Sequence, residues 1–480
     1  MKGDFFGRIF RGDKGIWFIF MFLCFISVTE VFSATSQLAY RQSFWTPITS
    51  HCIHLVMGTF IVLAVHRMPY KWWKVMAWLT LALSIALLAY LSLFGSAVNG
   101  GARWIPIFGF TFQPSELAKL SMVIITAFLL SRMQDDISSH RKVFWFIVGL
   151  TAVVCLLIFG ENISTAVILA LVVFVMTIIG GVARRIVGPI ALAGLLTVGL
   201  ALAFFILTPE HSMRSLAEKG GVLNRLPTAQ QRIKRAVITI DNPQDYRITD
   251  ENRQISHALI AVSSSGIIGC GPGNSVQRDF LSQAYSDFIY SIIIEELGLL
   301  GGLFVLMLYV ALLVRAGRIA RKCRTRFSAL LVMGCALMLV TQAMINMLIA
   351  VGLFPVTGQT LPLISRGGSS ILISCIYIGI ILNVSDSVER DDGEQMSEVI
   401  DYSNPSVSVT YRLPRPAGEN EEETGPEQYY RSPAALKGEN EEEAGSEQYY
   451  RSFATPAGSS AGKVTIHFTG ETQADDTDNS

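Results

Sequence analysis

Two ionisable side chains stand at the start of an apolar segment, in the motif FQPSELAKL. Glu116 and Lys119 are three residues apart, a spacing that places both on one face of a helix. Ionisable groups in a membrane segment are costly to bury, so each is a candidate functional residue. Two simpler interpretations remain open. Glu116 would cap the helix and offset its dipole, and Lys119 would extend its charge to the membrane surface.

A third carboxylate, Asp287, stands at the start of another apolar run, in the motif YSDFIYSIIIEELGLLGG. A carboxylate at the boundary between water and lipid can have a raised pKa and act as a general base. A neighbouring lysine would hold such a carboxylate ionised or bind a phosphate oxygen. Glu295 and Glu296 follow about 12 Å deeper along a helix. We interpret these two mainly as members of ion pairs inside a helix bundle.

Glycine and serine dominate the segment GLFPVTGQTLPLISRGGSS, which joins the last two apolar runs. Irregular backbone at membrane depth is tolerated only where protein or a cavity surrounds it. Glycines let backbone N–H groups approach an anion, and an arginine offers a phosphate contact. An ordinary tight turn is the alternative interpretation. A weaker glycine cluster, GCGPGN at 269–274, follows no strand pattern, which argues against a dinucleotide site there.

Long apolar runs must position these groups, because 51% of the 480 residues are hydrophobic and only 16% are charged. A soluble chain carries about 25% charged residues, and a helix needs about 20 apolar residues to cross a bilayer. The sequence therefore predicts an all-α integral membrane protein with a bundle of ten transmembrane helices. The predicted spans are 15–35, 50–66, 74–95, 114–132, 143–160, 163–180, 186–207, 286–314, 327–352 and 363–385.

The charge of the loops predicts the orientation of this bundle. With the N-terminal segment 1–14 in the cytoplasm, the inner segments hold 18 Lys and Arg residues, and the short outer loops hold only Arg41 and Arg103. Such a bias sets topology by the positive-inside rule, and it places both termini in the cytoplasm. The long loop between the seventh and eighth spans, 208–284, is then extracytoplasmic. Glu116, Lys119 and Asp287 fall at similar depths near the outer surface.

The chain becomes polar and acidic after residue 385, and Pro, Gly and Ser are frequent there. GENEEE occurs at 418–423 and 438–443, and EQYYRS at 427–432 and 447–452, which gives a period of 20 residues. Such a composition cannot bury enough apolar surface to fold alone. We expect a disordered cytoplasmic tail, 386–480, with two 20-residue repeats, attached to a membrane domain that covers 15–385.

Composition argues against several other kinds of partner. Lys plus Arg number 38, as do Asp plus Glu, so net charge gives no reason to expect a nucleic acid. The seven cysteines form no CxxC pair and no Cys/His ligand spacing, so we predict no metal site of the zinc type.

Three segments together resemble the SEDS family of membrane proteins. They are GARWIPIFGFTFQPSELAKL, NRQISHALIAVSSSGIIGCGPGNSVQRDFLSQAYSDFIYSIIIEELGLLGG and GLFPVTGQTLPLISRGGSSILI. They occur in the family's order, and the resemblance extends from about residue 15 to 385. It implies a ten-span peptidoglycan glycosyltransferase in the bacterial cytoplasmic membrane. The implied reaction polymerises lipid II, the undecaprenyl-pyrophosphate-linked disaccharide peptide, at the outer face of that membrane.

The resemblance also implies roles for individual residues. Asp287 matches the family's proposed catalytic aspartate. The implied substrate-binding residues are Glu116, Lys119, Arg103, Ser365, Arg366, Gly367, Gly368 and Ser369. No cofactor is implied with certainty, although a divalent cation remains an alternative. The implied partners are a class B penicillin-binding transpeptidase and, at a division septum, other divisome proteins.

The chain departs from the family pattern at two places. Asn162, in GENIST at 160–165, stands where many members have an aspartate, so this position cannot be an obligatory base. Arg366 stands where an aromatic residue often precedes the paired glycines. The N-terminal half most resembles the cell-division members, which predicts a septal location.

Three alternative functions remain open. They are an elongation polymerase, a lipid II flippase and an inactive scaffold that recruits partners through its tail. A flippase needs polar groups at several depths, and Glu30, Glu295 and Glu296 prevent its exclusion.

Overall fold

The protein is described from a computed structural model, which shows a bundle of helices. The described residues are 11–34, 45–69, 72–94, 105–107, 110–134, 136–159, 162–209, 230, 248–249, 252–281 and 284–399. Arg103 and the greater part of the predicted tail, 400–480, lie outside this described part of the chain.

Every predicted span contains a long helix. These helices are α2 (Lys14–Ala34), α4 (Trp45–His66), α5 (Trp72–Phe94), α6 (Pro114–Ser131), α7 (Ile137–Phe159), α8 (Ile163–Ile179), α9 (Arg184–Leu207), α13 (Ile289–Lys322), α14 (Arg326–Ala350) and α15 (Gly368–Val399). Apolar runs form helices in lipid because the bilayer offers the backbone no hydrogen-bond partner. Eight helices of the described part are long and apolar enough to cross a membrane, and α8 is shorter. The helical, multi-pass membrane fold is thus confirmed, and the count of ten spans stays a prediction.

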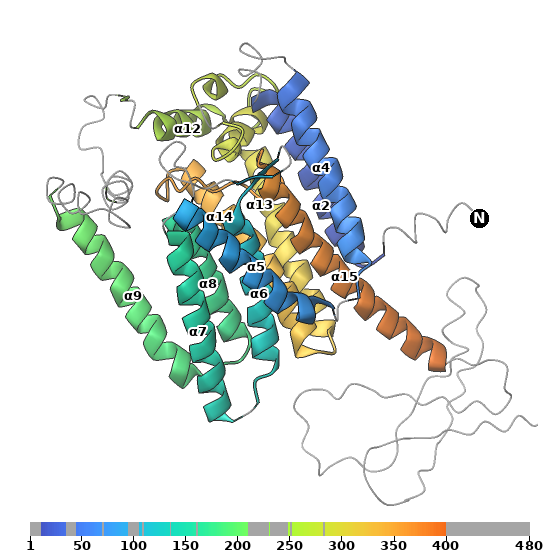
Figure 1. Ribbon diagram of the computed structural model, residues 1–480. Helices are drawn as coiled ribbons and strands as arrows, with labels where there is room; N and C mark the ends of the chain where they lie inside the picture. Colours follow the sequence, from blue (N-terminus) through green and yellow to red (C-terminus); the bar gives the residue numbers. More distant parts are fainter. Residues whose placement is uncertain are drawn as a thin grey trace, which may run out of the picture. The chain divides into compact units, whose positions relative to one another are not determined.

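α6 and α14 lie in the interior of the bundle. α14 packs against α13, α6 and α8, and α6 also packs against α5, α7 and α8. Most residues of both helices are buried. The connection between α9 and α13 contains α12 (Arg253–Ser264) and the short 3-10 helix η3 (Gln277–Asp279). Figure 1 shows α12 at the upper end of the bundle, where it packs against α13.

α13 differs from its predicted span in length and continuity. It begins at Ile289, so Asp287 precedes the helix, and its backbone is non-helical at Gly298, with φ 72° and ψ −176°. The N–H groups of Leu299 and Leu300 donate to carbonyls of Gly266 and Ile267 instead of continuing the helix. A side chain at position 298 would lie 2.2 Å from the carbonyl oxygen of Ile267. The connection between α9 and α13 therefore packs directly into a break in α13.

A short hairpin before α6 was not part of the all-α prediction. β1 (Ile105–Ile107) and β2 (Phe110–Phe112) pair antiparallel, with Ile105 opposite Phe112. β-branched and aromatic residues favour strands, and the motif WIPIFGFTF supplies them on both sides of a glycine. The hairpin ends directly before Gln113, which fixes the point where α6 begins.

The last helix is also longer than predicted. α15 continues to Val399, whereas the predicted tail begins at 386. The chain divides into two compact units, Met1–Glu389 and Arg390–Ser480. The repeats of the predicted tail lie beyond the residues that the structure describes.

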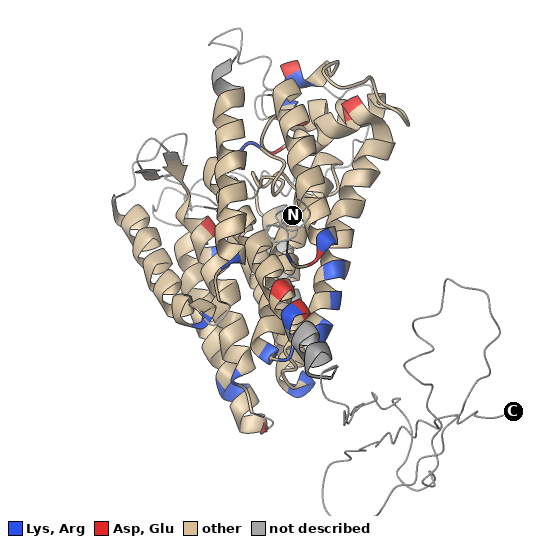
Figure 2. Ribbon diagram, turned by 90° about the vertical axis from the view of Figure 1, so that its right-hand side faces the viewer, with Lys and Arg blue, Asp and Glu red and all other residues tan. Residues whose placement is uncertain are grey.

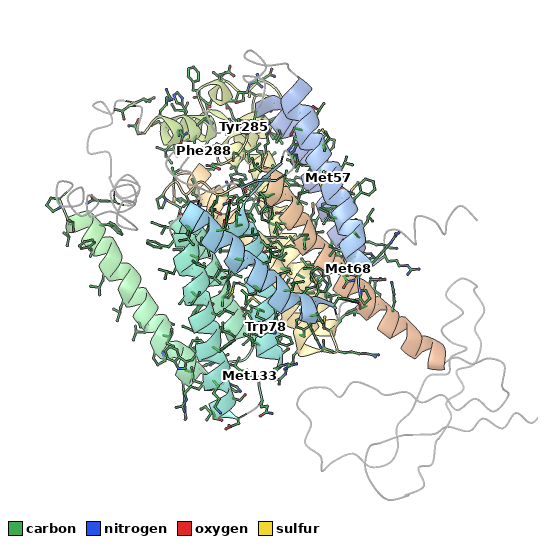
Figure 3. The ribbon with its side chains drawn as sticks, viewed as in Figure 1. Met57, Met68, Trp78, Met133, Tyr285 and Phe288 are labelled. Carbon is green, nitrogen blue, oxygen red and sulfur yellow. The ribbon has the colours of Figure 1, made fainter. Side chains whose placement is uncertain are left out.

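The two ends of the bundle differ in charge. Figure 2 shows Lys and Arg mainly toward the lower ends of the helices, and most of each helix between its ends carries no charge. Arg321 and Lys322, in the last turn of α13, belong to the basic connections. Figure 3 labels Met133 at the lower end, and Tyr285 and Phe288, which flank the Asp287 position, toward the upper end. Asp287 therefore lies toward the end opposite to the basic connections.

Candidate functional site

Glu116 and Lys119 form a buried ion pair in the first turns of α6. Gln113 is extended, and Pro114 begins the helix at a position where its missing N–H costs nothing. The Lys119 ammonium lies 2.8 Å from Glu116 Oε1, and the two side chains are 0% and 8% exposed. Each charge stabilises the other, because a buried charge without a partner is strongly destabilising. The full burial of Lys119 argues against the interpretation in which its charge extends to the membrane surface.

The ion pair is connected through α14 to the final turn, which we define as residues 351–367. Lys119 Nζ donates to Gln342 Oε1 at 2.7 Å, and Gln342 Nε2 donates to the carbonyl of Thr360 at 3.0 Å. The hydroxyl oxygens of Thr360 and Ser370 lie 3.0 Å apart, which extends the connection to the first turn of α15. α6 thus meets α14 and the final turn, which follow it by more than 200 residues in the chain, around one buried lysine.

Asp287 lies in the turn 284–288 that leads into α13. Its side chain is half-buried, and Oδ1 accepts a hydrogen bond from Ser286 Oγ at 3.0 Å. Its backbone carbonyl accepts a hydrogen bond from Asn346 Nδ2 of α14 at 2.9 Å. A general base must be held in place and still reach the proton that it removes. A half-buried carboxylate on a hydrogen-bonded turn meets both requirements.

The final turn contacts the turn that carries Asp287. Ser365 Oγ donates to the carbonyl of Ser286 at 2.6 Å, and the backbone N–H of Arg366 donates to the carbonyl of Tyr285 at 2.9 Å. The Arg366 guanidinium lies 5.3 Å from the centre of the Tyr285 ring, within the range of a cation–π interaction. Two predicted site segments, about 80 residues apart in the chain, are thus joined side by side.

Backbone strain marks the centre of the final turn. Leu363 has a φ of 66°, in the left-handed region that non-glycine residues rarely adopt. Such a conformation costs on the order of 1–3 kcal/mol and persists only where the surroundings fix it. The carbonyls on both sides are held, because Tyr309 donates to Pro362 and Ser27 Oγ donates to Ile364 at 2.8 Å.

The serines and glycines at the start of α15 shape the turn. Ser369 Oγ accepts a hydrogen bond from the backbone N–H of Gln113 at 3.2 Å, which ties α15 to the start of α6. A side chain at Gly368 would approach His54 Nε2 to 3.0 Å, whereas one at Gly367 would make ordinary contacts. Ser369, like Ser365, therefore hydrogen-bonds within the protein, and both help to build the walls of the site.

Sequence reasoning missed the polar residues that join these segments. Gln342 and Asn346 are among them, and Gln359 Nε2 also donates to Thr165 Oγ1 of α8 at 2.9 Å. The available signal was the pair of amides in the apolar run TQAMINMLIA, because polar groups inside membrane helices are rare unless they have partners. Arg103, which was also predicted to bind substrate, lies outside the described residues.

Glu295 and Glu296 hold the connection between α9 and α13 against α13. The backbone N–H of Val276 donates to Glu295 Oε1 at 3.0 Å, and that of Gly273 donates to Glu296 Oε2 at 2.9 Å. Arg278 Nη1 lies 3.7 Å from Glu296 Oε1. The ion pair predicted for these acids thus involves Glu296, and backbone N–H groups are their main partners. The glycine cluster at 269–274 supplies part of this backbone.

Asn162, one of the departures from the family pattern, begins α8. Its side chain accepts a hydrogen bond from the backbone N–H of Ser164 at 3.1 Å, which is the usual bond of a helix N-cap. Asparagine is among the best N-cap residues, so capping explains its presence here. Within the described part of the chain, no three His, Cys, Asp or Glu side chains are grouped to hold a metal ion.

Proteins of similar sequence include two curated relatives of the same name. The chain is 33% identical over 356 residues to a probable peptidoglycan glycosyltransferase FtsW of Hahella chejuensis, which covers 72% of this chain and 82% of that one. It is 34% identical over 342 residues to a probable peptidoglycan glycosyltransferase FtsW of Marinobacter nauticus, with coverage of 70% and 79%.

Two solved structures share the fold. A peptidoglycan synthase complex that coordinates polymerization and crosslinking includes a chain with a TM-score of 0.61 at 24% identity, over 79% of this chain and 99% of that one. The crystal structure of the rod shape determining protein RodA of Thermus thermophilus gives 0.53 at 22% identity, over 78% and 96%. The family model for FtsW, RodA and SpoVE, described as cell cycle proteins, matches residues 13–390. The chain therefore belongs to the FtsW, RodA and SpoVE family of cell cycle proteins.

Proposed function

We propose that this protein is a peptidoglycan glycosyltransferase that polymerises lipid II into glycan strands at the outer face of the cytoplasmic membrane. The observation that carries the proposal is that the Asp287 turn, the final turn and the Glu116–Lys119 pair are linked by hydrogen bonds through α14. The relatives named as peptidoglycan glycosyltransferases support it. Transfer to a hydroxyl with a pyrophosphate leaving group needs a base and positive charge, and this site contains both.

The reaction joins two lipid-linked disaccharide units. The 4-hydroxyl of the acceptor attacks the anomeric carbon of the donor, and a new glycosidic bond forms. The bond between that carbon and the pyrophosphate oxygen breaks, so undecaprenyl pyrophosphate leaves with the bonding electrons. Asp287 takes the hydroxyl proton as general base, because its half-buried carboxylate has access that the Glu116 carboxylate lacks.

Arg366 and Lys119 stabilise the negative charge of the pyrophosphate leaving group in different ways. Arg366 is half-buried and lies on the final turn, so its guanidinium has access to a phosphate oxygen. Lys119 is fully buried and already contacts Glu116 and Gln342, so it contributes positive charge from inside the bundle. Arg103 remains a candidate for a second phosphate contact.

The charge distribution supports an orientation with both termini in the cytoplasm. Basic residues occupy the ends of α13 and α14 that connect the two helices, and the Asp287 turn lies at the other end of α13. By the positive-inside rule, this distribution supports a site at the outer surface, where we propose that lipid II is polymerised. We assign the protein to the division septum because both relatives carry the name FtsW. An elongation polymerase is the alternative within the family.

Transport of lipid II is less well supported than polymerisation. A transporter needs polar groups spread through the depth of the membrane. Among the buried Asp, Glu and Lys residues that the structure describes, Asp386 lies toward the inner end of α15 and the others lie in the outer parts of their helices. Those others are Glu30, Glu116, Lys119, Glu295 and Glu296. This distribution favours chemistry at one surface.

A transpeptidase is the proposed partner. One of the similar solved structures is that of a peptidoglycan synthase complex in which polymerization and crosslinking are coordinated. We infer that a class B penicillin-binding transpeptidase crosslinks the strands that this protein makes. Other divisome proteins would recruit the pair to the septum.

Purified protein supplied with lipid II tests the proposed function. We expect glycan strands to form, at a higher rate when the transpeptidase is present. A protein that moves lipid II across vesicles but forms no polymer, with or without its partner, would establish transport and contradict the proposal.

A further inference from the structure

α14 carries two buried amide side chains that the reaction described above does not use. Gln342 and Asn346 are four residues apart, which places them on one face of the helix. They are 4% and 0% exposed. A buried amide is costly unless it has hydrogen-bond partners. The partners of these two amides therefore indicate why α14 contains them.

The orientation of the Gln342 amide is fixed by what it touches. Its Oε1 accepts from the ammonium of Lys119 at 2.7 Å, and its Nε2 donates to the carbonyl of Thr360 at 3.0 Å. An ammonium can only donate and a carbonyl can only accept, so the reversed amide would lose both hydrogen bonds. Gln342 thus connects the ion pair of α6 to the final turn.

The orientation of the Asn346 amide is fixed in the same way. Its Nδ2 donates to the carbonyl of Asp287 at 2.9 Å and to the carbonyl of Gln359 at 2.7 Å. Both amide hydrogens are therefore used, one of them on the proposed catalytic residue itself. Oδ1 has no hydrogen-bond partner in the described part of the chain.

The two amides hold consecutive residues of the final turn. Gln342 contacts Thr360, and Asn346 contacts Gln359. One face of a rigid helix therefore sets the separation between the Asp287 backbone, the final turn and the ammonium of Lys119. A helix holds side chains in more precise positions than a loop does. Asp287 and Thr360 both lie on irregular backbone, so their positions depend on the contacts that α14 makes with them.

We propose that Gln342 and Asn346 are positioning residues for glycosyl transfer, with Asn346 acting through the backbone carbonyl of Asp287. This inference rests on the proposed function. Loss of Asn346 lets the Asp287 turn move relative to the acceptor hydroxyl, while the surfaces that bind lipid II remain. A displacement of about 1 Å at a reacting group can lower a rate by about 10²-fold. The expected effect is on kcat, with KM little changed.

The chain offers a matched control in Asn383 of α15. Asn383 Nδ2 also donates to two backbone carbonyls, those of His66 and Met68, and its Oδ1 also has no hydrogen-bond partner among the described residues. Its side chain is 5% exposed. Asn383 connects the C-terminal end of α4 to α15. This contact is distant from the final turn along both helices. Asn383→Ala therefore removes the same kind of hydrogen bonds without touching the site.

The experiment compares purified Asn346→Ala and Asn383→Ala in lipid II polymerisation, at a temperature where thermal unfolding shows both to be folded. We expect kcat to fall at least about tenfold for Asn346→Ala, with KM within about threefold of wild type. We expect kcat of Asn383→Ala to stay within about twofold. Gln342→Met keeps the side-chain length and a high helix propensity, so it tests the same inference by the same measurement if Asn346→Ala does not fold.

Equal losses of kcat in the Asn346 and Asn383 variants, or a change in KM alone, would overturn the positioning role. Failure of the proposed function looks different, because the wild-type protein itself would then form no polymer. Where wild type does polymerise lipid II, the positioning role also fails if the Asn346 and Gln342 variants polymerise it as fast as wild type.

Discussion

The hydroxyl of Ser365 donates to the carbonyl of Ser286 at 2.6 Å, directly before Asp287 in the chain. The same oxygen accepts a hydrogen bond from the backbone N–H of Leu361 at 2.7 Å. Leu361 and Ser365 flank the strained Leu363, and the hydroxyl of Ser365 contacts the backbone of Leu361. The same hydroxyl contacts the turn that carries the proposed base. The position of the base depends on a residue that need not touch the substrate.

Replacement of this hydroxyl should affect both stability and activity. Ser365→Ala leaves the buried N–H of Leu361 without a partner, at a cost of about 1–3 kcal/mol, and also releases the partly buried carbonyl of Ser286. We expect a lower unfolding temperature in detergent and a loss of polymerisation of at least about tenfold, because the Asp287 turn is released.

Ser84→Ala is the control for this prediction. Ser84 is a buried serine of α5 that donates to the carbonyl of Leu81 at 2.8 Å, outside the proposed site. If the two alanine variants polymerised lipid II equally well, Ser365 would have no influence on the base.

Single and double replacements in the Glu116–Lys119 pair should distinguish its effect on stability from its effect on catalysis. Lys119→Met leaves the Glu116 carboxylate buried without its charge partner, which typically costs about 3–5 kcal/mol. The double replacement Glu116→Gln with Lys119→Met removes both charges and should recover much of that stability, measured by thermal unfolding. We still expect the double variant to polymerise lipid II slowly, because the positive charge behind the leaving group is gone. A stable double variant with the wild-type rate would show that the pair is structural only.

The sequence predicted the helices well because each apolar run must satisfy its own backbone in lipid. It named Asp287 and residues of the final turn as site residues, but it did not predict the hydrogen bonds that join these two segments. It could not predict the links through Gln342 and Asn346. A polar residue inside an apolar run indicates that a partner exists, but the partner is set by how helices pack, and helix spacing along the chain does not contain that information.

The break in α13 was missed for a related reason. Gly298 stands within a predicted span, and a glycine inside a helical segment usually remains helical at a modest cost. Its non-helical backbone depends on contacts with Gly266 and Ile267, which lie about 30 residues earlier in the connection, and the sequence does not show which residues of that connection reach α13. The hairpin before α6 escaped the prediction because three-residue strands are too short to show an alternating pattern.

Two native cysteines can test the membrane orientation. Cys270 is exposed in the connection between α9 and α13, and Cys323 lies half-buried in the connection between α13 and α14. Burial raises the pKa of the Cys270 thiol, with Glu295 and Glu296 adding to the shift, and burial also raises the pKa of the Cys323 thiol. The thiolate is the reactive form, so labelling of both should become faster as the pH rises toward and above about 8.5.

The measurement uses single-cysteine variants and a membrane-impermeant maleimide on intact spheroplasts. We expect Cys270 to react in intact spheroplasts and Cys323 to react only after the membrane is permeabilised. The opposite pattern would reverse the orientation and move the site to the cytoplasmic side.

The most direct test of the account is polymerisation of lipid II by purified Asp287→Asn. The replacement keeps the size of the side chain and its ability to hydrogen-bond, but it cannot accept the proton. Loss of a positioned general base typically lowers a rate by about 10²–10⁴-fold. Asp279→Asn is the control, because Asp279 lies in the same connection between α9 and α13 with its side chain 53% exposed. We predict that Asp287→Asn is folded and forms almost no polymer while Asp279→Asn polymerises normally, and a near wild-type rate for Asp287→Asn would contradict the assignment of the base.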